Sequence, residues 1–181
     1  MQRVKVKDKE FEIFITEKEI CKAVDGVVEK MSRDLKGKNP LFIAILNGAF
    51  MFASDLFKKY PGDCQISFVK YASYRGTSST GQVATLIGSN EEVTGRSIVI
   101  LEDIIDSGIT MEQVVKDIKA HHPLEVRIAT LLFKPDAFVK NYQIDYIGMS
   151  VPNDFIVGYG LDYDGYGRNF KDIYKLAESF E

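Results

Sequence analysis

The sequence predicts an α/β fold with a mainly parallel sheet flanked by helices. Segments with the apolar pattern of strands alternate with segments of helical period along most of the chain. Residues 41–46, LFIAIL, are continuously apolar, which is typical of a parallel strand buried on both faces. The chain has 181 residues, of which 45% are hydrophobic, enough for one domain with a sizeable core.

The elements are assigned in chain order from these patterns. The predicted strands are residues 11–15, 41–46, 66–71, 82–87, 97–101, 126–133, 146–151 and 155–159. The predicted helices are residues 20–31, 49–57 and 111–118. Thr16 and Glu19 match a capping box before the first helix, and Pro123 follows the last. Residues 76–81, GTSSTG, are small and polar, so we expect a mobile loop there.

Both ends of the chain depart from the strand–helix alternation. The strand at 11–15 and the strands after Tyr146 are not separated by helices of their own. We therefore expect residues 1–181 to form one domain with a core of about 16–145. A small hood lobe would be built from about residues 1–15 and 146–181.

Composition and charge exclude several classes of protein. The net charge is −3, so no nucleic-acid-binding surface is indicated, and no basic residues lie among Tyr159, Tyr163 and Tyr166. No apolar run approaches the roughly 20 residues of a membrane span, and we expect no membrane partner. Cys21 and Cys64 lack metal-binding spacing, which favours a reducing, cytoplasmic setting with both thiols buried.

The motif VILEDIIDSGIT, residues 99–110, carries the strongest functional signal. An apolar strand leads into Glu102 and Asp103, and a third acid, Asp106, opens a turn before a helix. The turn offers consecutive backbone N–H groups, a glycine and hydroxyls, which is typical of an anion site at a helix N-terminus. A phosphate there explains the turn but would be repelled by the acids. Ribose hydroxyls or Mg²⁺ with its waters suit carboxylates better, so the motif indicates a sugar phosphate with a diol.

This motif resembles the phosphoribosyl-pyrophosphate (PRPP) binding motif of type I phosphoribosyltransferases, in the form found in the hypoxanthine-guanine branch. Further segments resemble the same family in the same order along roughly residues 5–175. They are LNGAFMFASDL at 46–56, KYASYRGTSSTG at 70–81, LLFKPD at 131–136 and VPNDFIVGYGLDYDGYGR at 151–168. The resemblance implies the type I phosphoribosyltransferase fold.

The resemblance also implies the reaction and its partners. PRPP and hypoxanthine, or guanine, give IMP or GMP and pyrophosphate in purine salvage, with Mg²⁺ required. Family members commonly form homodimers or homotetramers. Two alternatives stay open: a phosphoribosyltransferase for xanthine or a pyrimidine, and a non-catalytic regulator that senses PRPP.

The implied purine site involves five residues of the matched segments. Asp106 corresponds to the candidate general base at the purine N7, and Lys134 to the lysine that donates to O6. Phe155 corresponds to the aromatic that stacks on the purine, although core packing would also explain it. Ile156 and Asp162 correspond to the positions whose carbonyls receive the amine of guanine.

Other implied roles concern the ribose phosphate, the pyrophosphate, the metal and a closing loop. The residues for the ribose and 5′-phosphate are Glu102, Asp103, Asp106, Ser107, Gly108, Ile109 and Thr110. Those for the pyrophosphate are Asn47, Gly48 and Arg168, those for Mg²⁺ are Glu102, Asp103 and Asp162, and those of the loop are Ser73 and Tyr74. Some family members have lysine where this chain has Asn47, so we expect one weaker electrostatic contact there.

Overall fold

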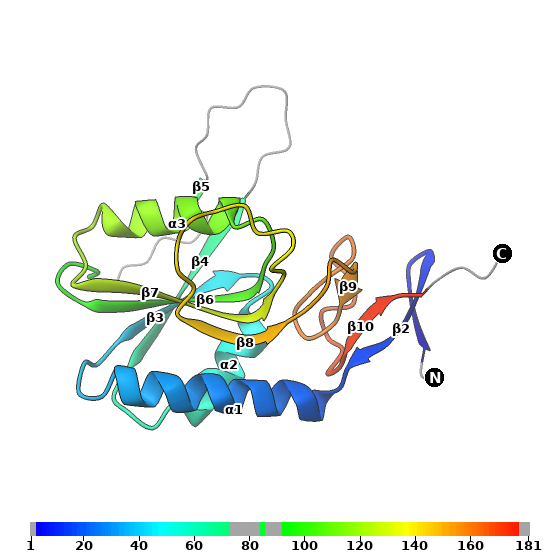
Figure 1. The fold of residues 1–181 in the computed structure, drawn as a ribbon, viewed down its shortest axis with the longest axis horizontal. Coiled ribbons are helices and arrows are strands. Elements are labelled where there is room, and N and C mark those ends of the chain that lie inside the picture. Colours follow the sequence, from blue (N-terminus) through cyan, green and yellow to red (C-terminus); the bar gives the residue numbers. More distant parts are fainter. Residues whose placement is uncertain (1–2, 73–83, 86–91, 178–181) are drawn as a thin grey trace.

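Two sheets organise the fold (Figure 1). The computed structural model describes residues 3–72, 84–85 and 92–177. Within these residues, the large sheet has the order β5-β4-β3-β6-β7-β8, formed by Ala84–Thr85, Gln65–Ala72, Leu41–Leu46, Ser97–Ile105, Glu125–Phe133 and Tyr146–Ser150. The small sheet has the order β1-β2-β10-β9, formed by Arg3–Val6, Lys9–Ile15, Ile173–Leu176 and Ile156–Val157.

The large sheet is mainly parallel, as the sequence predicts. Its neighbours from β4 through β3, β6 and β7 to β8 all pair in parallel, and β5 pairs antiparallel with β4. The carboxyl ends of the parallel strands therefore meet at one edge of the sheet, where ligands of open α/β folds bind.

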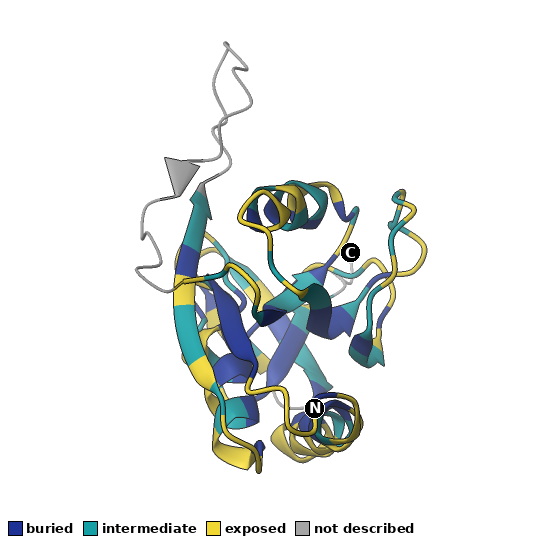
Figure 2. Cartoon of the chain, turned by 90° about the vertical axis from the view of Figure 1, so that its left-hand side faces the viewer, coloured by how far each residue is buried: buried dark blue, intermediate teal, exposed yellow. Residues whose placement is uncertain are grey.

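Helices cover both faces of this sheet. Helices α1 (Glu17–Asp34) and α2 (Phe50–Lys59) lie on one face, and α3 (Ile109–Lys119) lies on the other (Figure 1). The apolar run at the start of β6 is buried on both faces, since Leu101 packs under α1 and α2 whereas Ile100 packs under α3. Figure 2 shows the central strands largely buried between the helices. None of the helices in the described segments is long and apolar enough to span a membrane.

The start of α1 confirms the predicted capping box. The side chain of Thr16 accepts a hydrogen bond from the backbone N–H of Glu19, and the Glu19 carboxylate accepts one from the N–H of Thr16. Two backbone donors that have no partner within the helix are thereby satisfied.

The small lobe combines both ends of the chain, but its C-terminal part begins later in the sequence than predicted. Strand β10 pairs with β2, so strands from the two ends of the chain lie side by side (Figure 1). The expected boundary at residue 146 is wrong, because β8 pairs in parallel with β7 and belongs to the large sheet. The lobe takes its C-terminal strands only from β9 and β10.

Several predicted strand limits also differ from the structure. Strand β6 continues to Ile105, so Glu102 and Asp103 lie within it; pairing with β7 stabilises this polar extension. The strand predicted at 155–159 is only Ile156–Val157, because the backbone turns into the left-handed region at Gly158. Of the strand predicted at 82–87, the structure describes only β5. The loop at 76–81 lies outside the described residues.

The two cysteines are free thiols. Cys64 is partly buried, whereas Cys21 is exposed, so the prediction that both are buried is wrong for Cys21. Cys21 lies on a position of α1 outside the stripe of buried residues, which explains its exposure.

Candidate active site

The predicted acids, lysine and loops meet at the carboxyl edge of the large sheet. Asp103 approaches the backbone of Gly48, in the turn between β3 and α2. Three residues further on, Asp106 approaches Lys134, which follows β7. The loop after β9 reaches the same place, because Gly160 contacts the carbonyl of Gly48. Four segments far apart in the sequence thus build one site.

Lys134 and Asp106 form a half-buried ion pair. The Nζ of Lys134 lies 3.5 Å from Oδ2 of Asp106. The side chain of Lys134 is only 11% exposed, whereas that of Asp106 is 56% exposed. Lys134 is therefore a buried lysine and not a surface one. The pair offers a cationic donor and a carboxylate acceptor side by side, with the acceptor open to a ligand.

The turn after Asp106 forms a small cavity at the start of α3. The cavity has a volume of about 190 Å³ and is lined by Glu102, Ile104, Ile105, Asp106, Ser107, Gly108, Thr110 and Met111. Gly108 takes a left-handed conformation, with φ 80°, and precedes the first residue of the helix. The hydroxyl of Tyr142 donates to the Gly108 carbonyl at 3.0 Å and fixes the outer side of the turn. Ile109 does not line the cavity, and its side chain is exposed.

Glu102 and Asp103 face different neighbours although they are adjacent. Glu102 lines the small cavity, and Asp103 approaches Gly48. Burial and the charge of Asp103 raise the pKa of Glu102 well above its usual value. Burial also raises the pKa of Asp103, while hydrogen bonds from Glu102 and the Ile104 N–H and the charge of Arg168 act against this rise. Hydroxyl donors or a cation placed here would favour the charged form of both carboxylates.

Gly48 has no room for a side chain. A Cβ atom built on Gly48 would overlap the carboxylate of Asp103. The peptide bond between Leu46 and Asn47, just before Gly48, is cis. The side chain of Asn47 is exposed at the same edge. The turn therefore presents backbone rather than side chain to Asp103.

Arg168 and Asp162 hold each other in the loop of the small lobe. The guanidinium of Arg168 pairs with Oδ1 of Asp162 at 2.6 Å and donates to the Gly160 carbonyl at 2.6 Å. Oδ2 of Asp162 accepts from the N–H of Gly165. Within the described residues, no three His, Cys, Asp or Glu side chains are grouped so as to hold a metal. The expected ligand set of Glu102, Asp103 and Asp162 is therefore not brought together.

Phe155 and Ile156 occupy contrasting environments. Phe155 is 46% exposed and packs edge-on against Tyr163, with ring centroids 5.7 Å apart. Its ring also lies against the buried Phe11, with centroids 6.0 Å apart, so packing accounts for part of Phe155 while another part is open to a ligand. Ile156 is buried in β9 and offers its backbone only. Ser73 and Tyr74, predicted for the closing loop, lie outside the described residues.

The geometry agrees with comparisons with known proteins. Residues 14–164 match the family model described as the phosphoribosyl transferase domain. A hypoxanthine-guanine phosphoribosyltransferase of Mycobacterium bovis is 36% identical over 168 residues, which cover 89% of this chain and 82% of the relative. The chain belongs to the hypoxanthine-guanine phosphoribosyltransferase family. A relative of the same name from Lactococcus lactis is 37% identical, and the match covers 87% of this chain and 86% of the relative.

Solved structures of this family have the same fold. The crystal structure of a hypoxanthine phosphoribosyltransferase from Staphylococcus aureus superposes with a TM-score of 0.86 at 32% identity. The match covers 92% of this chain and 91% of that one. The fold class predicted from the sequence, the type I phosphoribosyltransferase fold, is thereby confirmed.

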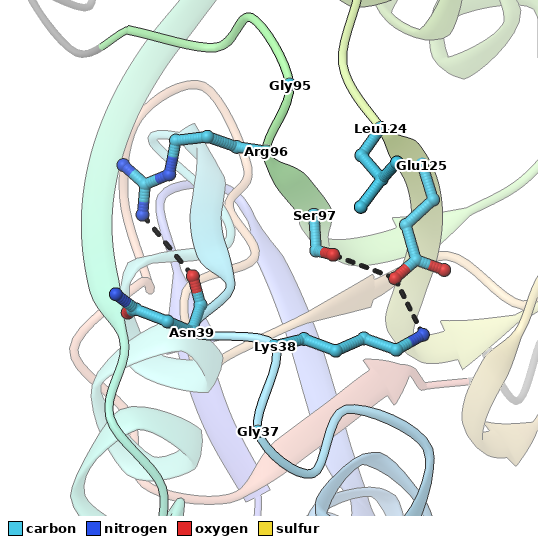
Figure 3. A pocket seen from close by; sticks show the side chains of 8 residues that line it. All are labelled: Gly37, Lys38, Asn39, Gly95, Arg96, Ser97, Leu124 and Glu125. Carbon is cyan, nitrogen blue, oxygen red and sulfur yellow. Dashed lines mark hydrogen bonds and ion pairs between the residues drawn. The ribbon is translucent and has the colours of Figure 1, made fainter.

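A second cavity lies at the amino ends of the strands, away from the carboxyl edge (Figure 3). It has a volume of about 610 Å³ and is lined by Gly37, Lys38, Asn39, Gly95, Arg96, Ser97, Leu124 and Glu125. Glu125 accepts hydrogen bonds from Lys38 and Ser97, both at 2.8 Å. None of the residues predicted for the family's active site lines this cavity. We assign its charged groups to structural pairing.

This pairing predicts a pH-dependent contribution to stability. Burial would raise the pKa of Glu125, but hydrogen bonds from Lys38, Ser97 and Arg127 lower it to about 2 from the usual 4.5. A lowered pKa stabilises the fold above pH 4.5, and this stabilisation is lost as the pH falls to about 2. We expect Glu125→Gln to lower the free energy of unfolding by about 2 kcal/mol at pH 7, with the deficit shrinking below pH 4.5. Urea unfolding at several pH values checks this, and a deficit that is constant with pH would contradict it.

Sequence reasoning missed some residues that shape the site. Gly160 and Tyr142 fix the loops around Gly48 and Gly108, and Asp55 accepts a hydrogen bond from Tyr159. The alternation of glycine and tyrosine from Gly158 to Gly160 was a signal for an unusual backbone there. Contacts between lobes leave no local pattern, so Asp55 had no such signal.

Proposed function

We propose that the chain transfers the phosphoribosyl group of PRPP to N9 of hypoxanthine and guanine, giving IMP or GMP and pyrophosphate in purine salvage. The ion pair of Lys134 and Asp106 beside the small cavity carries this proposal. The ion pair suits recognition of a purine, and the adjoining cavity suits recognition of a sugar phosphate. Family membership supports the same reaction.

The ion pair suits one edge of a 6-oxopurine. O6 and N7 lie next to each other on that edge. Lys134 donates to O6, and Asp106 accepts the proton that the ring loses as N9 attacks C1′ of the ribose. Adenine carries an amino group in place of O6, so it would leave the buried lysine without an acceptor. The pair therefore selects hypoxanthine and guanine over adenine.

The small cavity suits the ribose phosphate. Ser107, Gly108 and Thr110 line it at the start of α3, where backbone N–H groups and the helix dipole favour a phosphate. Ile109 would contribute its N–H only, because its side chain points away into solvent. Glu102 and Asp103 would accept hydrogen bonds from the 2′- and 3′-hydroxyls. The three acids are then compatible because each contacts a different part of one ligand.

The remaining predicted contacts come from the loops. The exposed ring of Phe155 would stack on the purine, and the carbonyls of Ile156 and Asp162 would receive the amine of guanine. Gly48, Asn47 and Arg168 would bind the pyrophosphate, which is supported by Gly160 lying between the Gly48 carbonyl and the Arg168 guanidinium. Ser73 and Tyr74 would close over the ligands and exclude water from an oxocarbenium-like transition state.

Mg²⁺ fits the acids that the structure brings together. Mg²⁺ is usually held by one or two carboxylates, with substrate phosphates and waters completing its shell. Glu102 and Asp103 meet this requirement, and a cation would act against the burial and the charge of Asp103 that together raise the pKa of Glu102. When bound, Mg²⁺ neutralises charge on the pyrophosphate leaving group. Asp162 would join only after it releases Arg168.

We also expect a cytoplasmic enzyme that forms a homodimer or homotetramer and binds neither nucleic acid nor membranes. The two free thiols support a reducing compartment. Light scattering at micromolar concentration measures the assembly directly.

Lys134→Gln is expected to raise the KM for hypoxanthine about tenfold or more and to leave the KM for PRPP nearly unchanged. The reason is that the substitution removes a charged donor placed for O6 while the cavity for the sugar phosphate stays intact. Lys140→Gln is the matched control, because it breaks a lysine–glutamate pair with Glu112 outside the site. An unchanged KM for hypoxanthine would remove Lys134 from the purine site.

A panel of bases tests the proposed function against its alternatives. Nucleotide formation from PRPP is measured with hypoxanthine, guanine, xanthine, adenine and uracil. We expect turnover with hypoxanthine and guanine and almost none with adenine. Turnover confined to xanthine or uracil would identify a different phosphoribosyltransferase. Binding of PRPP without turnover on any base would indicate a regulator.

A further inference from the structure

Three consecutive residues at the start of the small-lobe loop have left-handed backbones. Gly158, Tyr159 and Gly160 have φ values of 105°, 48° and 97°. A bulky residue such as tyrosine rarely adopts a positive φ, and such strain persists only where surrounding contacts fix it. We therefore expect contacts of Tyr159 that hold its backbone in this conformation.

Tyr159 links the small lobe to helix α2. Its side chain is buried in the core, and its hydroxyl donates to Oδ2 of Asp55 on α2 at 2.6 Å. Burial raises the pKa of Tyr159 far above its usual value, so the hydroxyl remains a donor. Its backbone N–H donates to the Phe170 carbonyl at 2.8 Å. Helix α2 begins directly after the turn that contains Gly48.

Gly160, the residue after Tyr159, is hydrogen-bonded to Arg168. The carbonyl of Gly160 accepts from the Arg168 guanidinium at 2.6 Å, and its N–H donates to the Arg168 carbonyl at 3.0 Å. A Cβ atom built on Gly160 would overlap the carbonyl of Gly48. The position of Gly160 thus sets both the guanidinium of Arg168 and the backbone of Gly48.

We propose that Tyr159 and Asp55 are positioning residues that hold Arg168 and the Gly48 turn together as a pyrophosphate site. The proposal rests on the proposed function and adds two residues that do not themselves touch the ligand. Without the hydrogen bond, Gly160 is held less firmly, and Arg168 and Gly48 no longer keep one fixed spacing. Pyrophosphate should be affected most, because it contacts both lobes.

The test measures pyrophosphate affinity by calorimetry in the presence of Mg²⁺, and the KM values for PRPP and hypoxanthine. We expect Tyr159→Phe to weaken pyrophosphate and raise the KM for PRPP about threefold to tenfold, with the KM for hypoxanthine changed less. Asp55→Ala should act alike, and the double variant should be no worse than either single variant. Asp55→Asn should retain most affinity, because its amide oxygen can still accept from Tyr159.

Tyr146→Phe is the matched control for a purely structural effect. Tyr146 is also buried and donates to an aspartate, Asp34, at 3.1 Å, but it lies at the amino end of β8. We expect this variant to lose thermal stability without any change in pyrophosphate affinity. If Tyr159→Phe behaves in the same way, the positioning role is contradicted while turnover by the unmodified protein upholds the proposed function.

Calorimetry keeps the two proposals separable. An unmodified protein that binds pyrophosphate but makes no nucleotide would contradict the proposed function, and the variants would still test the positioning role. An unmodified protein that does not bind pyrophosphate would overturn the positioning role.

Discussion

Asp106→Asn is expected to lower kcat by about 10²- to 10⁴-fold with hypoxanthine, the range typical of a lost general base. Asparagine has nearly the same shape, so the turn before α3 and its backbone N–H groups should persist. The carboxylate that accepts the ring proton disappears, and Lys134 loses the partner that lies 3.5 Å away. PRPP affinity should change little, because Glu102 and the cavity remain.

Single-turnover kinetics and PRPP binding together check this expectation. Asp63→Asn is the control, because it makes the same change of charge at an exposed position outside the site. Near-normal kcat in the Asp106 variant, with chemistry shown to limit the rate, would contradict the assignment of Asp106 as the base. Single-turnover measurement is needed because slow product release can hide a large effect on the chemical step.

Gly48→Ala should lower kcat/KM by about 10²-fold while the protein stays folded. The added methyl group would overlap the carboxylate of Asp103, so Asp103 must move away from the position that suits a ribose hydroxyl. Displacements of about 1 Å in an active site typically have effects of this size. Steady-state kinetics measure the loss, and circular dichroism checks the fold.

Gly26→Ala is the matched control for Gly48→Ala. Gly26 lies inside α1, and a Cβ atom there would meet nothing within 4 Å. Alanine favours helix over glycine by about 1 kcal/mol, so this variant should be slightly more stable and fully active. Full activity in Gly48→Ala would show that Asp103 can move without consequence and would contradict its role at the ribose.

Local patterns predicted much of the fold because helix capping and strand burial depend on residues that are close together in the sequence. The capping box of Thr16 and Glu19 marked the start of α1, and the two-sided burial of Leu41–Leu46 left an apolar run. The small lobe was harder to predict, since β10 exists through pairing with β2 more than 150 residues earlier. The extension of β6 through Glu102 likewise depends on its neighbour β7, not on the propensity of an acid for strands.

The candidate site could also be predicted only where its contacts arise within one stretch of the sequence. The acid motif predicted which residues gather around Asp106, because one strand and one turn fix their spacing. The sequence did not predict that Asp162 pairs with Arg168, or that Tyr159 reaches Asp55, since each contact depends on loops that fold against another part of the chain. The resemblance to a family named the roles of single residues but not these partnerships.

The central claim is that this site catalyses phosphoribosyl transfer and does not only bind PRPP. Consumption of bound PRPP tests this claim most directly. PRPP labelled in the ribose is bound to excess protein, and hypoxanthine is added with and without Mg²⁺. We predict that with Mg²⁺ the label passes into IMP with one pyrophosphate released per nucleotide, and that without Mg²⁺ little label is transferred. Label that stays in bound PRPP in the presence of Mg²⁺ and of either hypoxanthine or guanine would contradict the account.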